Sequence, residues 1–477
     1  PEPQFFPKIL AFTGGNAMRY MSCAVQLLVC SAPTIASVIY VDAGARGAND
    51  GSTWADAMNL LQDALVLASA GDEIWVARGV YAPTDTLDRA ATFALKDGVS
   101  VIGGFSGSET TLDQRDWRRN TTVLSGELGN TQDSSDNTFR IVSAVGLTAE
   151  AILDGFRIER AYNDRSGPDN AGGAIYLDNT VAKIVNCRLS SSYAGLGGGI
   201  CTLNSMLTLD NCVIARNDHA GCYSEGSTVL AISCTFKRNR ANRGGAVNAS
   251  NGSTVVARHC AFIGNRAYLV GGALYVYGNP LFDCCLFTRN NATSEGAYAG
   301  AMLLRTGSAT ITNCTIVKNW SEFNAGGIIT FSETSTPTIR NCILWGNRSR
   351  NGEAHGWVEK DQAVLHAGSM KQCLVEAYTG LYGGRSNFDG DPMFVDVEDR
   401  NLRVRAGSPC IDRGKDEPVT ETTDLDGNPR ILSGRVDLGA YESVCEGVRQ
   451  FEVEARENDS GGYDVTASLK THLPAGS

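Results

Sequence analysis

In the stretch Cys260-Ala261-Phe262-Ile263-Gly264-Asn265, a cysteine and an asparagine enclose four residues. The same pair recurs in six segments, whose cysteines are separated by 22, 26, 25, 29 and 28 residues. The six pairs are Cys212 with Asn217, Cys234 with Asn239, Cys260 with Asn265, Cys285 with Asn290, Cys314 with Asn319 and Cys342 with Asn347. A repeat of this length is typical of a solenoid, in which each repeat packs on its neighbours.

A second motif, two small residues before an apolar step, lies between these pairs. It reads Gly172-Gly173-Ala174-Ile175, Gly197-Gly198-Gly199-Ile200, Gly244-Gly245-Ala246-Val247, Gly271-Gly272-Ala273-Leu274, Ala299-Gly300-Ala301-Met302 and Gly326-Gly327-Ile328-Ile329. The two motifs stay in phase although the repeat length varies. This behaviour indicates a coil with fixed walls and one turn of variable length.

The segments between the motifs have the character of strands. Ser253–Ala257 and Ala309–Thr312 are short, alternating and rich in β-branched residues, and none reaches the length that a stacked helix pair needs. We therefore predict an all-β parallel β-helix, in which successive coils pair about 4.8 Å apart.

In such a coil the repeated residues have structural roles. Cysteine is small and often buried, so the six cysteines are expected to stack as an inward row. The asparagines are expected to pass hydrogen bonds from coil to coil, and the glycine pairs to permit a positive φ. Stacked parallel positions suit disulfides poorly, and the sequence has no Cys-x-x-Cys pair. We predict free thiols and no metal site, with disulfides between coils as the alternative.

The flanks divide the chain further. Residues 1–37 contain a basic start at Met18-Arg19, an apolar stretch and small residues, which predict a signal peptide. Residues 38–150 are interpreted as a cap with the first coils, including an amphipathic helix with apolar positions from Trp54 to Ala68. The repeats occupy 151–375, C-terminal coils and a further module 376–445, and a tail 446–477.

The composition limits the function. The 477 residues carry a net charge of −11, and no basic run or stretch of about 20 apolar residues stands out. We therefore expect neither a nucleic-acid partner nor a transmembrane span. The segment Asp424-Leu425-Asp426-Gly427-Asn428-Pro429-Arg430 permits two interpretations, a calcium loop or a simple turn, and the turn is favoured because the later glutamate of an EF-hand is missing.

The repeats resemble those of the polymorphic outer membrane proteins, in which a Gly-Gly-Ala-Ile step alternates with Phe-x-x-Asn. That motif stands here as Phe236 to Asn239, Phe262 to Asn265 and Phe287 to Asn290. The segments Ile152–Phe156 and Gly407–Asp412 resemble bacterial secreted right-handed β-helix proteins, and Asp424–Arg430 and Arg435–Glu442 resemble their choice-of-anchor module. The resemblance implies a right-handed helix and a secreted or surface location, including association with an outer membrane.

The acids that an enzyme of this fold needs are scattered, and no Asp-Asp pair or Gly-His-Gly occurs along the repeats. We predict no catalytic residues and no cofactor. The residues that follow each apolar step are expected to point outward by strand alternation. Four of them, Tyr176, Asn248, Tyr275 and Thr330, are the candidate binding residues, with a covering loop as the alternative.

These observations favour a secreted or surface scaffold that binds an extracellular glycan or a cell-surface protein without catalysis. The alternative is a polysaccharide lyase or glycoside hydrolase acting on acidic glycans. A third interpretation is a purely structural envelope protein.

Overall fold

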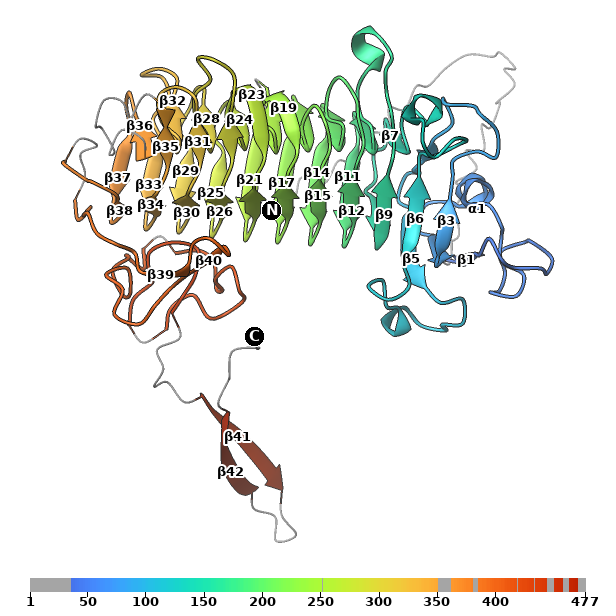
Figure 1. The fold of residues 1–477 in the computed structure, drawn as a ribbon. Helices are drawn as coiled ribbons and strands as arrows, with labels where there is room; N and C mark the ends of the chain where they lie inside the picture. Colours follow the sequence, from blue (N-terminus) through green and yellow to red (C-terminus); the bar gives the residue numbers. More distant parts are fainter. Residues whose placement is uncertain are drawn as a thin grey trace, which may run out of the picture. The chain divides into compact units, whose positions relative to one another are not determined.

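A computed structural model describes residues 36–250, 252–350, 362–380, 385–417, 419–432 and 434–443, and the backbone of 450–457 and 463–470. The predicted signal peptide lies outside the described residues except for Ala36 and Ser37, and of the predicted tail 446–477 only the backbone of 450–457 and 463–470 is described. The chain folds as a parallel β-helix whose strands stack coil upon coil (Figure 1). The predicted fold class is confirmed.

Three long parallel sheets form the walls of the β-helix. Sheet 1 has twelve strands: β1 (Val38–Val41), β2 (Glu73–Ala77), β5 (Ser100–Phe105), β8 (Ala151–Asp154), β11 (Val181–Val185), β14 (Met206–Asp210), β17 (Thr228–Ile232), β21 (Thr254–Arg258), β25 (Leu281–Asp283), β29 (Thr310–Thr312), β33 (Thr338–Arg340) and β37 (Ser369–Lys371). Sheet 2 has eleven: β3 (Gly79–Tyr81), β6 (Thr122–Ser125), β9 (Phe156–Glu159), β12 (Arg188–Ser190), β15 (Val213–Ala215), β18 (Thr235–Lys237), β22 (Ala261–Ile263), β26 (Leu286–Thr288), β30 (Thr315–Val317), β34 (Ile343–Trp345) and β38 (Leu374–Val375).

The third wall and a short fourth sheet complete the coils. Sheet 3 has ten strands: β4 (Phe93–Ala94), β7 (Val142–Val145), β10 (Ile175–Asp178), β13 (Ile200–Leu203), β16 (Cys222–Glu225), β20 (Val247–Ala249), β24 (Leu274–Val276), β28 (Met302–Leu304), β32 (Ile328–Thr330) and β36 (Ala363–Val364). Sheet 4 has five: β19 (Arg240–Arg243), β23 (Arg266–Val270), β27 (Asn291–Ala292), β31 (Trp320–Ser321) and β35 (Arg348–Ser349). Sheet 4 lies in the turn of variable length, between the asparagine and the glycine pair.

The corner between sheets 1 and 2 places each cysteine inside. The residue before it has a left-handed backbone, as His259 does at φ 52°, and this sharp turn lets Cys260 point inward. The six predicted cysteines are buried with free thiols in the core of the β-helix. The Cys260 thiol donates to the Arg258 carbonyl at 3.2 Å, and its sulfur accepts from the Cys234 backbone N–H at 3.4 Å.

The next corner contains the asparagines, which form a continuous ladder. Each side-chain oxygen accepts from the backbone N–H and from the side-chain amide of the asparagine one coil before it, as Asn265 does from Asn239 at 3.1 Å in both cases. Each amide also donates to a carbonyl of the preceding coil, for example Asn265 to Phe236 at 2.9 Å. Ser192 extends the ladder at one end, and Gln362 accepts from Asn347 at 2.8 Å at the other.

The glycine pair is required for two different reasons. Gly271 has a left-handed φ of 63°, as predicted. Gly272 instead packs so closely that a Cβ atom there would lie 2.2 Å from the Gly300 carbonyl oxygen. The second glycine is therefore needed for close contact between coils.

The N-terminal helix is shorter than the sequence pattern predicts. Helix α1 comprises only Leu61–Leu67, and its residues Leu61, Ala64 and Leu65 join the core of the β-helix. The prediction was wrong for Trp54, which lies before the helix. Its ring packs 4.7 Å from Tyr40 and its Nε1 donates to the Glu109 carbonyl, so an aromatic cluster outside the coil holds it.

After β38 the chain turns back along the β-helix. Strands β39 (Phe394–Asp396) and β40 (Asn401–Val404) pair antiparallel, and the segment up to Ser443 contacts the corner between sheets 1 and 2. Asn341 holds it by accepting from the Lys415 N–H and donating to the Lys415 carbonyl, at 3.0 and 2.9 Å. We call residues 388–443 the C-terminal module. A hairpin follows, β41 (Gln450–Glu457) and β42 (Tyr463–Lys470).

Candidate ligand-binding surface

The predicted outward row on sheet 3 exists, but its members differ from the prediction. Strand register places these residues side by side: Tyr176, Cys201, Tyr223, Asn248, Tyr275, Leu303, Ile329 and Val364. Thr330 was wrongly included, because Ile328 and not Ile329 pairs with Met302, so Thr330 is buried beside Leu304. Tyr223 was missed because its coil lacks a glycine pair and reads Gly221-Cys222.

This row does not form one open face. Tyr275, Leu303 and Ile329 are buried in a second apolar cluster with Val270 and Ala299, outside the β-helix core. The Arg140 guanidinium lies over the Tyr176 ring at 3.8 Å, and the Tyr223 hydroxyl donates to Glu225 at 2.8 Å. Asn248 is only partly exposed. These contacts therefore cover most of the outward surface of sheet 3 that was predicted to bind a ligand.

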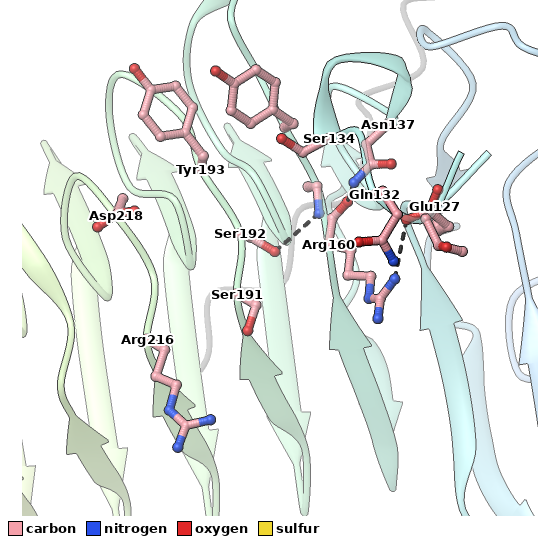
Figure 2. Close-up of a pocket in the computed structure, with 13 residues that line it drawn as sticks. Glu127, Gln132, Ser134, Asn137, Arg160, Ser191, Ser192, Tyr193, Arg216 and Asp218 are labelled. Carbon is pink, nitrogen blue, oxygen red and sulfur yellow. Dashed lines mark hydrogen bonds and ion pairs between the residues drawn. The ribbon is translucent and has the colours of Figure 1, made fainter. Parts of the chain in front are cut away.

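An open groove lies instead beside the asparagine corner, near the start of the ladder (Figure 2). It encloses about 460 Å³. We call it the tyrosine groove, and it is lined by Glu127, Thr131, Gln132, Ser134, Asn137, Arg160, Ala161, Tyr162, Ser191, Ser192, Tyr193, Arg216 and Asp218. Tyr162 and Tyr193 occupy bridged positions of successive coils and their rings stack at 4.9 Å. The Tyr193 ring also meets the His219 ring edge-on at 5.1 Å.

The corner geometry directs the polar side chains of the tyrosine groove outward. Arg160, Ser191 and Arg216 each precede a ladder position and have left-handed φ values of 72°, 56° and 58°. This backbone conformation turns the side chain of the following ladder residue inward. The side chains of Arg160, Ser191 and Arg216 themselves therefore face solvent. Figure 2 shows Ser191 and Arg216 following one another along the corner.

One wall of the groove comes from the loop between β6 and β7. Glu127 forms an ion pair with Arg160 at 3.2 Å, and the Asn137 amide donates to the Arg160 carbonyl at 2.7 Å. Arg89 supports the other side by donating to the Tyr162 carbonyl and to Asp164, both at 2.8 Å. The tyrosine groove therefore combines aromatic faces with hydrogen-bond donors and acceptors that are held in place.

A group of cations continues from the tyrosine groove along sheet 2. We call Arg188, Arg216, Lys237, Arg238 and Arg400 the basic patch. Burial lowers the pKa of the Lys237 ammonium, and the positive charges of Arg188, Arg238, Arg216 and Arg400 lower it further. Among the described residues no carboxylate lies within ion-pair distance of these five side chains.

Neither the basic patch nor the tyrosine groove was predicted from the sequence. The expectation that no basic run occurs was wrong, since Lys237-Arg238-Asn239-Arg240 places three cations among four residues. The ladder asparagine Asn239 interrupts this run of cations. The tyrosine groove had a weaker signal, because Tyr162 and Tyr193 both directly follow a ladder position, Ala161 or Ser192, where no asparagine stands.

The acidic residues do not gather. Within the described part of the chain, no group of three or more metal-binding side chains forms. Asp154 pairs with Arg115 at 2.7 Å. In the segment interpreted as a calcium loop or a turn, the Asp424 carboxylate accepts from the backbone N–H groups of Asp426 and Asn428, at 2.9 and 2.8 Å. These bonds are typical of a turn built on an aspartate side chain.

No helix in the described residues is long and apolar enough to cross a membrane.

Comparison with known proteins agrees with this architecture. A family model described as a right handed beta helix region matches residues 162–281. Among solved structures, the chain is similar to pectate lyase Pel9A, with 15% identity, a TM-score of 0.52, and coverage of 85% of this chain and 96% of that one. None of the curated proteins matches this sequence.

Two further structures are more distant. A rhamnogalacturonan lyase has 10% identity and a TM-score of 0.32, covering 86% of this chain and 97% of its own. The PL6 family alginate lyase AlyGC has 11% identity and a TM-score of 0.27, covering 82% and 60%. At 15% identity, the similarity to pectate lyase Pel9A concerns the fold alone. By its sheets, by the family model and by the similarity to pectate lyase Pel9A, the protein is a right-handed parallel β-helix.

Proposed function

We propose that this protein is a secreted or cell-surface scaffold that binds an extracellular glycan in the tyrosine groove without converting it. The observation that carries the proposal is the stacked pair Tyr162 and Tyr193, whose rings lie 4.9 Å apart in an open groove. Aromatic faces suit the apolar face of a sugar ring, and a few placed polar groups set its orientation. The signal-peptide pattern of residues 18–37 supports export.

The polar lining supports binding over hydrolysis. A glycoside hydrolase needs two carboxyl groups free to act on either side of the bond. Of the two carboxylates that line the tyrosine groove, Glu127 is engaged by Arg160 at 3.2 Å. Asp218 and Arg160 remain suited to accept from and donate to sugar hydroxyls, and Arg216 contributes a further donor.

The test is glycan binding by the full chain, measured on an array and then by calorimetry. We expect the double variant Tyr162→Ala, Tyr193→Ala to bind about tenfold more weakly, a loss of about 1.4 kcal/mol. The double phenylalanine variant keeps the rings and should keep the affinity. Tyr268→Ala, at a side chain that is 59% exposed elsewhere on the coil, is the matched control. Unchanged binding by the double alanine variant contradicts the proposal.

A second candidate is a polysaccharide lyase acting on an acidic glycan, and Lys237 favours it. Its lowered pKa leaves a larger fraction of neutral amine to act as a base. In a β-elimination, the amine takes the proton from the carbon beside the sugar carboxylate and a double bond forms to the next ring carbon. The carbon–oxygen bond on that carbon breaks, and the leaving oxygen departs as a sugar hydroxyl after taking a proton from water. The surrounding arginines would stabilise the charge that develops on the carboxylate.

Turnover separates the two candidates. Purified protein is incubated with polygalacturonate and with alginate, and the ultraviolet absorbance of unsaturated sugar products is followed. The scaffold proposal expects none. Product formation that disappears in Lys237→Met would replace the scaffold by the lyase.

A further inference from the structure

We infer that the basic patch extends the tyrosine groove into a binding surface for a linear polyuronate, so that the glycan bound by this protein is acidic. The inference rests on the proposed function and adds the chemical class of its ligand. It is carried by the position of the patch and by the absence of acidic partners around it.

The tyrosine groove and the basic patch are continuous because they share Arg216. Arg216 and Arg238 occupy the same corner position in successive coils, each before a ladder asparagine and each with a left-handed backbone, at φ 58° and 57°. Successive coils lie about 4.8 Å apart. This spacing is close to the length of one pyranose unit along a chain, so one cation per coil matches one carboxylate per sugar.

Sheet 2 and the C-terminal module contribute the other cations of the basic patch. Lys237 is the last residue of β18 and pairs in register with Ala215 of β15. Arg188 is the first residue of β12, the strand that precedes β15 in sheet 2. Arg400 belongs to the C-terminal module. The arginine side chains offer planar pairs of donors, which suit carboxylates.

The cations that occupy this corner position in other coils are paired with carboxylates, whereas, among the described residues, Arg216 and Arg238 are not. Farther along the same corner, Arg289 and Lys318 both pair with Glu398 of the C-terminal module, at 3.2 and 3.7 Å. At the other end, Arg160 pairs with Glu127. Between these ends the described residues supply no carboxylate to Arg216 or Arg238, and both side chains are exposed. Like charges held together without counter-charges attract a polyanion.

The rest of the molecule favours a polyuronate over a nucleic acid. The net charge of −11 acts on both polyanions alike, so the distinction rests on hydroxyl groups, of which a polyuronate carries more than one for each charge and a DNA backbone carries none. The carboxylate of Asp218, which lines the groove with Arg216, can accept hydrogen bonds from the sugar hydroxyls of a polyuronate.

The test compares two double variants of the full chain. Arg216→Asn with Arg238→Asn removes two charges from the patch, and asparagine tolerates the left-handed backbone of both positions. Arg46→Asn with Arg119→Asn removes two exposed charges elsewhere and is the matched control. The probes are polygalacturonate, neutral dextran and a single-stranded oligonucleotide.

We expect wild type to bind polygalacturonate more tightly than dextran. The patch variant should bind polygalacturonate about tenfold more weakly, since each lost ion pair with a ligand weakens binding severalfold. Raising the salt concentration from about 50 to about 500 mM should weaken wild type more than the patch variant. Equal weakening in the control, or tighter binding of the oligonucleotide than of polygalacturonate, overturns the inference.

The failures of the two proposals are distinguishable. If only the patch variant loses polygalacturonate binding while Tyr162→Ala, Tyr193→Ala does not, the groove proposal fails and the charge recognition is real. If only the tyrosine variant loses binding, the glycan is bound in the tyrosine groove and the inference about its charge fails.

Discussion

The side-chain oxygen of Asn290 accepts two hydrogen bonds from Asn265, one from the backbone N–H at 2.9 Å and one from the side-chain amide at 3.0 Å. The Asn265 oxygen repeats this arrangement with Asn239. The Asn265 side chain therefore satisfies buried groups of the preceding coil and donates to the ladder oxygen of the following one. Two adjacent coils depend on each amide.

Removing one amide from the middle of the ladder should be costly. Asn265→Ala leaves the Asn239 N–H and the Phe236 carbonyl buried without these partners. We expect the free energy of unfolding to fall by about 3 kcal/mol, because each unsatisfied buried group costs roughly 1–3 kcal/mol. The measurement is urea unfolding followed by circular dichroism. Asn242→Ala, at an exposed asparagine of β19, is the control and should change little. Equal stability of the two variants would show that the ladder contributes nothing.

The asparagine ladder could be predicted from the sequence, because an asparagine recurs at a constant distance from the cysteine in each repeat. The corner before each cysteine was not predicted, because its left-handed residues differ in type: Asn211, Ser233, His259 and Cys284 all occupy it. A backbone conformation shared by different side chains leaves no repeated letter in the sequence. The predicted orientation of Thr330 was wrong for a related reason. Two successive isoleucines precede it, and the sequence does not show which of them points inward.

The buried thiols should be unreactive in the folded protein. Burial raises the pKa of the Cys260 thiol and raises that of Cys222 to about 12, so these two carry little thiolate near neutral pH. Against the effect of burial, hydrogen bonds with neighbouring thiols lower the pKa of Cys285 and Cys342, so for these two it is the closed core that keeps the reagent out. We expect iodoacetamide to leave the twelve described cysteines unlabelled in the native state and to label all of them in urea, as measured by peptide mass spectrometry. The same count without reductant tests for disulfides. Rapid labelling of Cys212 or Cys260 in the native protein would mean that the cysteine row is not interior.

Polyuronate binding should depend on pH through Lys237. Its pKa is below the ordinary lysine value of 10.5, because of burial and of Arg188, Arg238, Arg216 and Arg400. The ammonium is charged below the lowered pKa and neutral above it, so affinity should fall as the pH rises through that value. The ligand carboxylates stay ionised throughout. Lys237→Arg keeps the charge and should flatten the profile, whereas Lys371→Arg on sheet 1 should not. An identical profile for Lys237→Arg and wild type removes Lys237 from the binding surface.

The tyrosine groove could not be read from the sequence because its wall is not part of the repeat. Glu127 and Asn137 come from a loop between β6 and β7, and only folding brings them to Arg160. The sequence contains the cationic residues of the basic patch, but it does not show that the described structure places no carboxylate beside them. Glu398 neutralises Arg289 across 109 residues of sequence and leaves Arg238 without such a partner.

The C-terminal module is held together by a buried ion pair. Arg430 and Glu442 approach to 3.0 Å with 1% exposed side chains, and Arg430 also donates to the Gly439 carbonyl at 2.7 Å. Burial raises the pKa of Glu442 to about 8 although Arg430 lowers it, so in Arg430→Met the Glu442 carboxyl takes up a proton and the Gly439 carbonyl loses its donor. We expect the module to lose roughly 1–3 kcal/mol of local stability, the cost of leaving a buried acceptor unsatisfied. Limited proteolysis with mass spectrometry should then detect cleavage between residues 408 and 443.

A nearby ion pair provides the control for that experiment. Arg403 pairs with Asp426 in the same module, but its side chain is 47% exposed, so Arg403→Met should cost less than about 1 kcal/mol. The β-helix itself should remain intact in both variants, since coils contact mainly their neighbours and unfold semi-independently. If Arg430→Met resists protease as well as Arg403→Met does, the hydrogen bonds of Asn341 to Lys415 and of Thr315 to Ala440 suffice to hold the module against the coils.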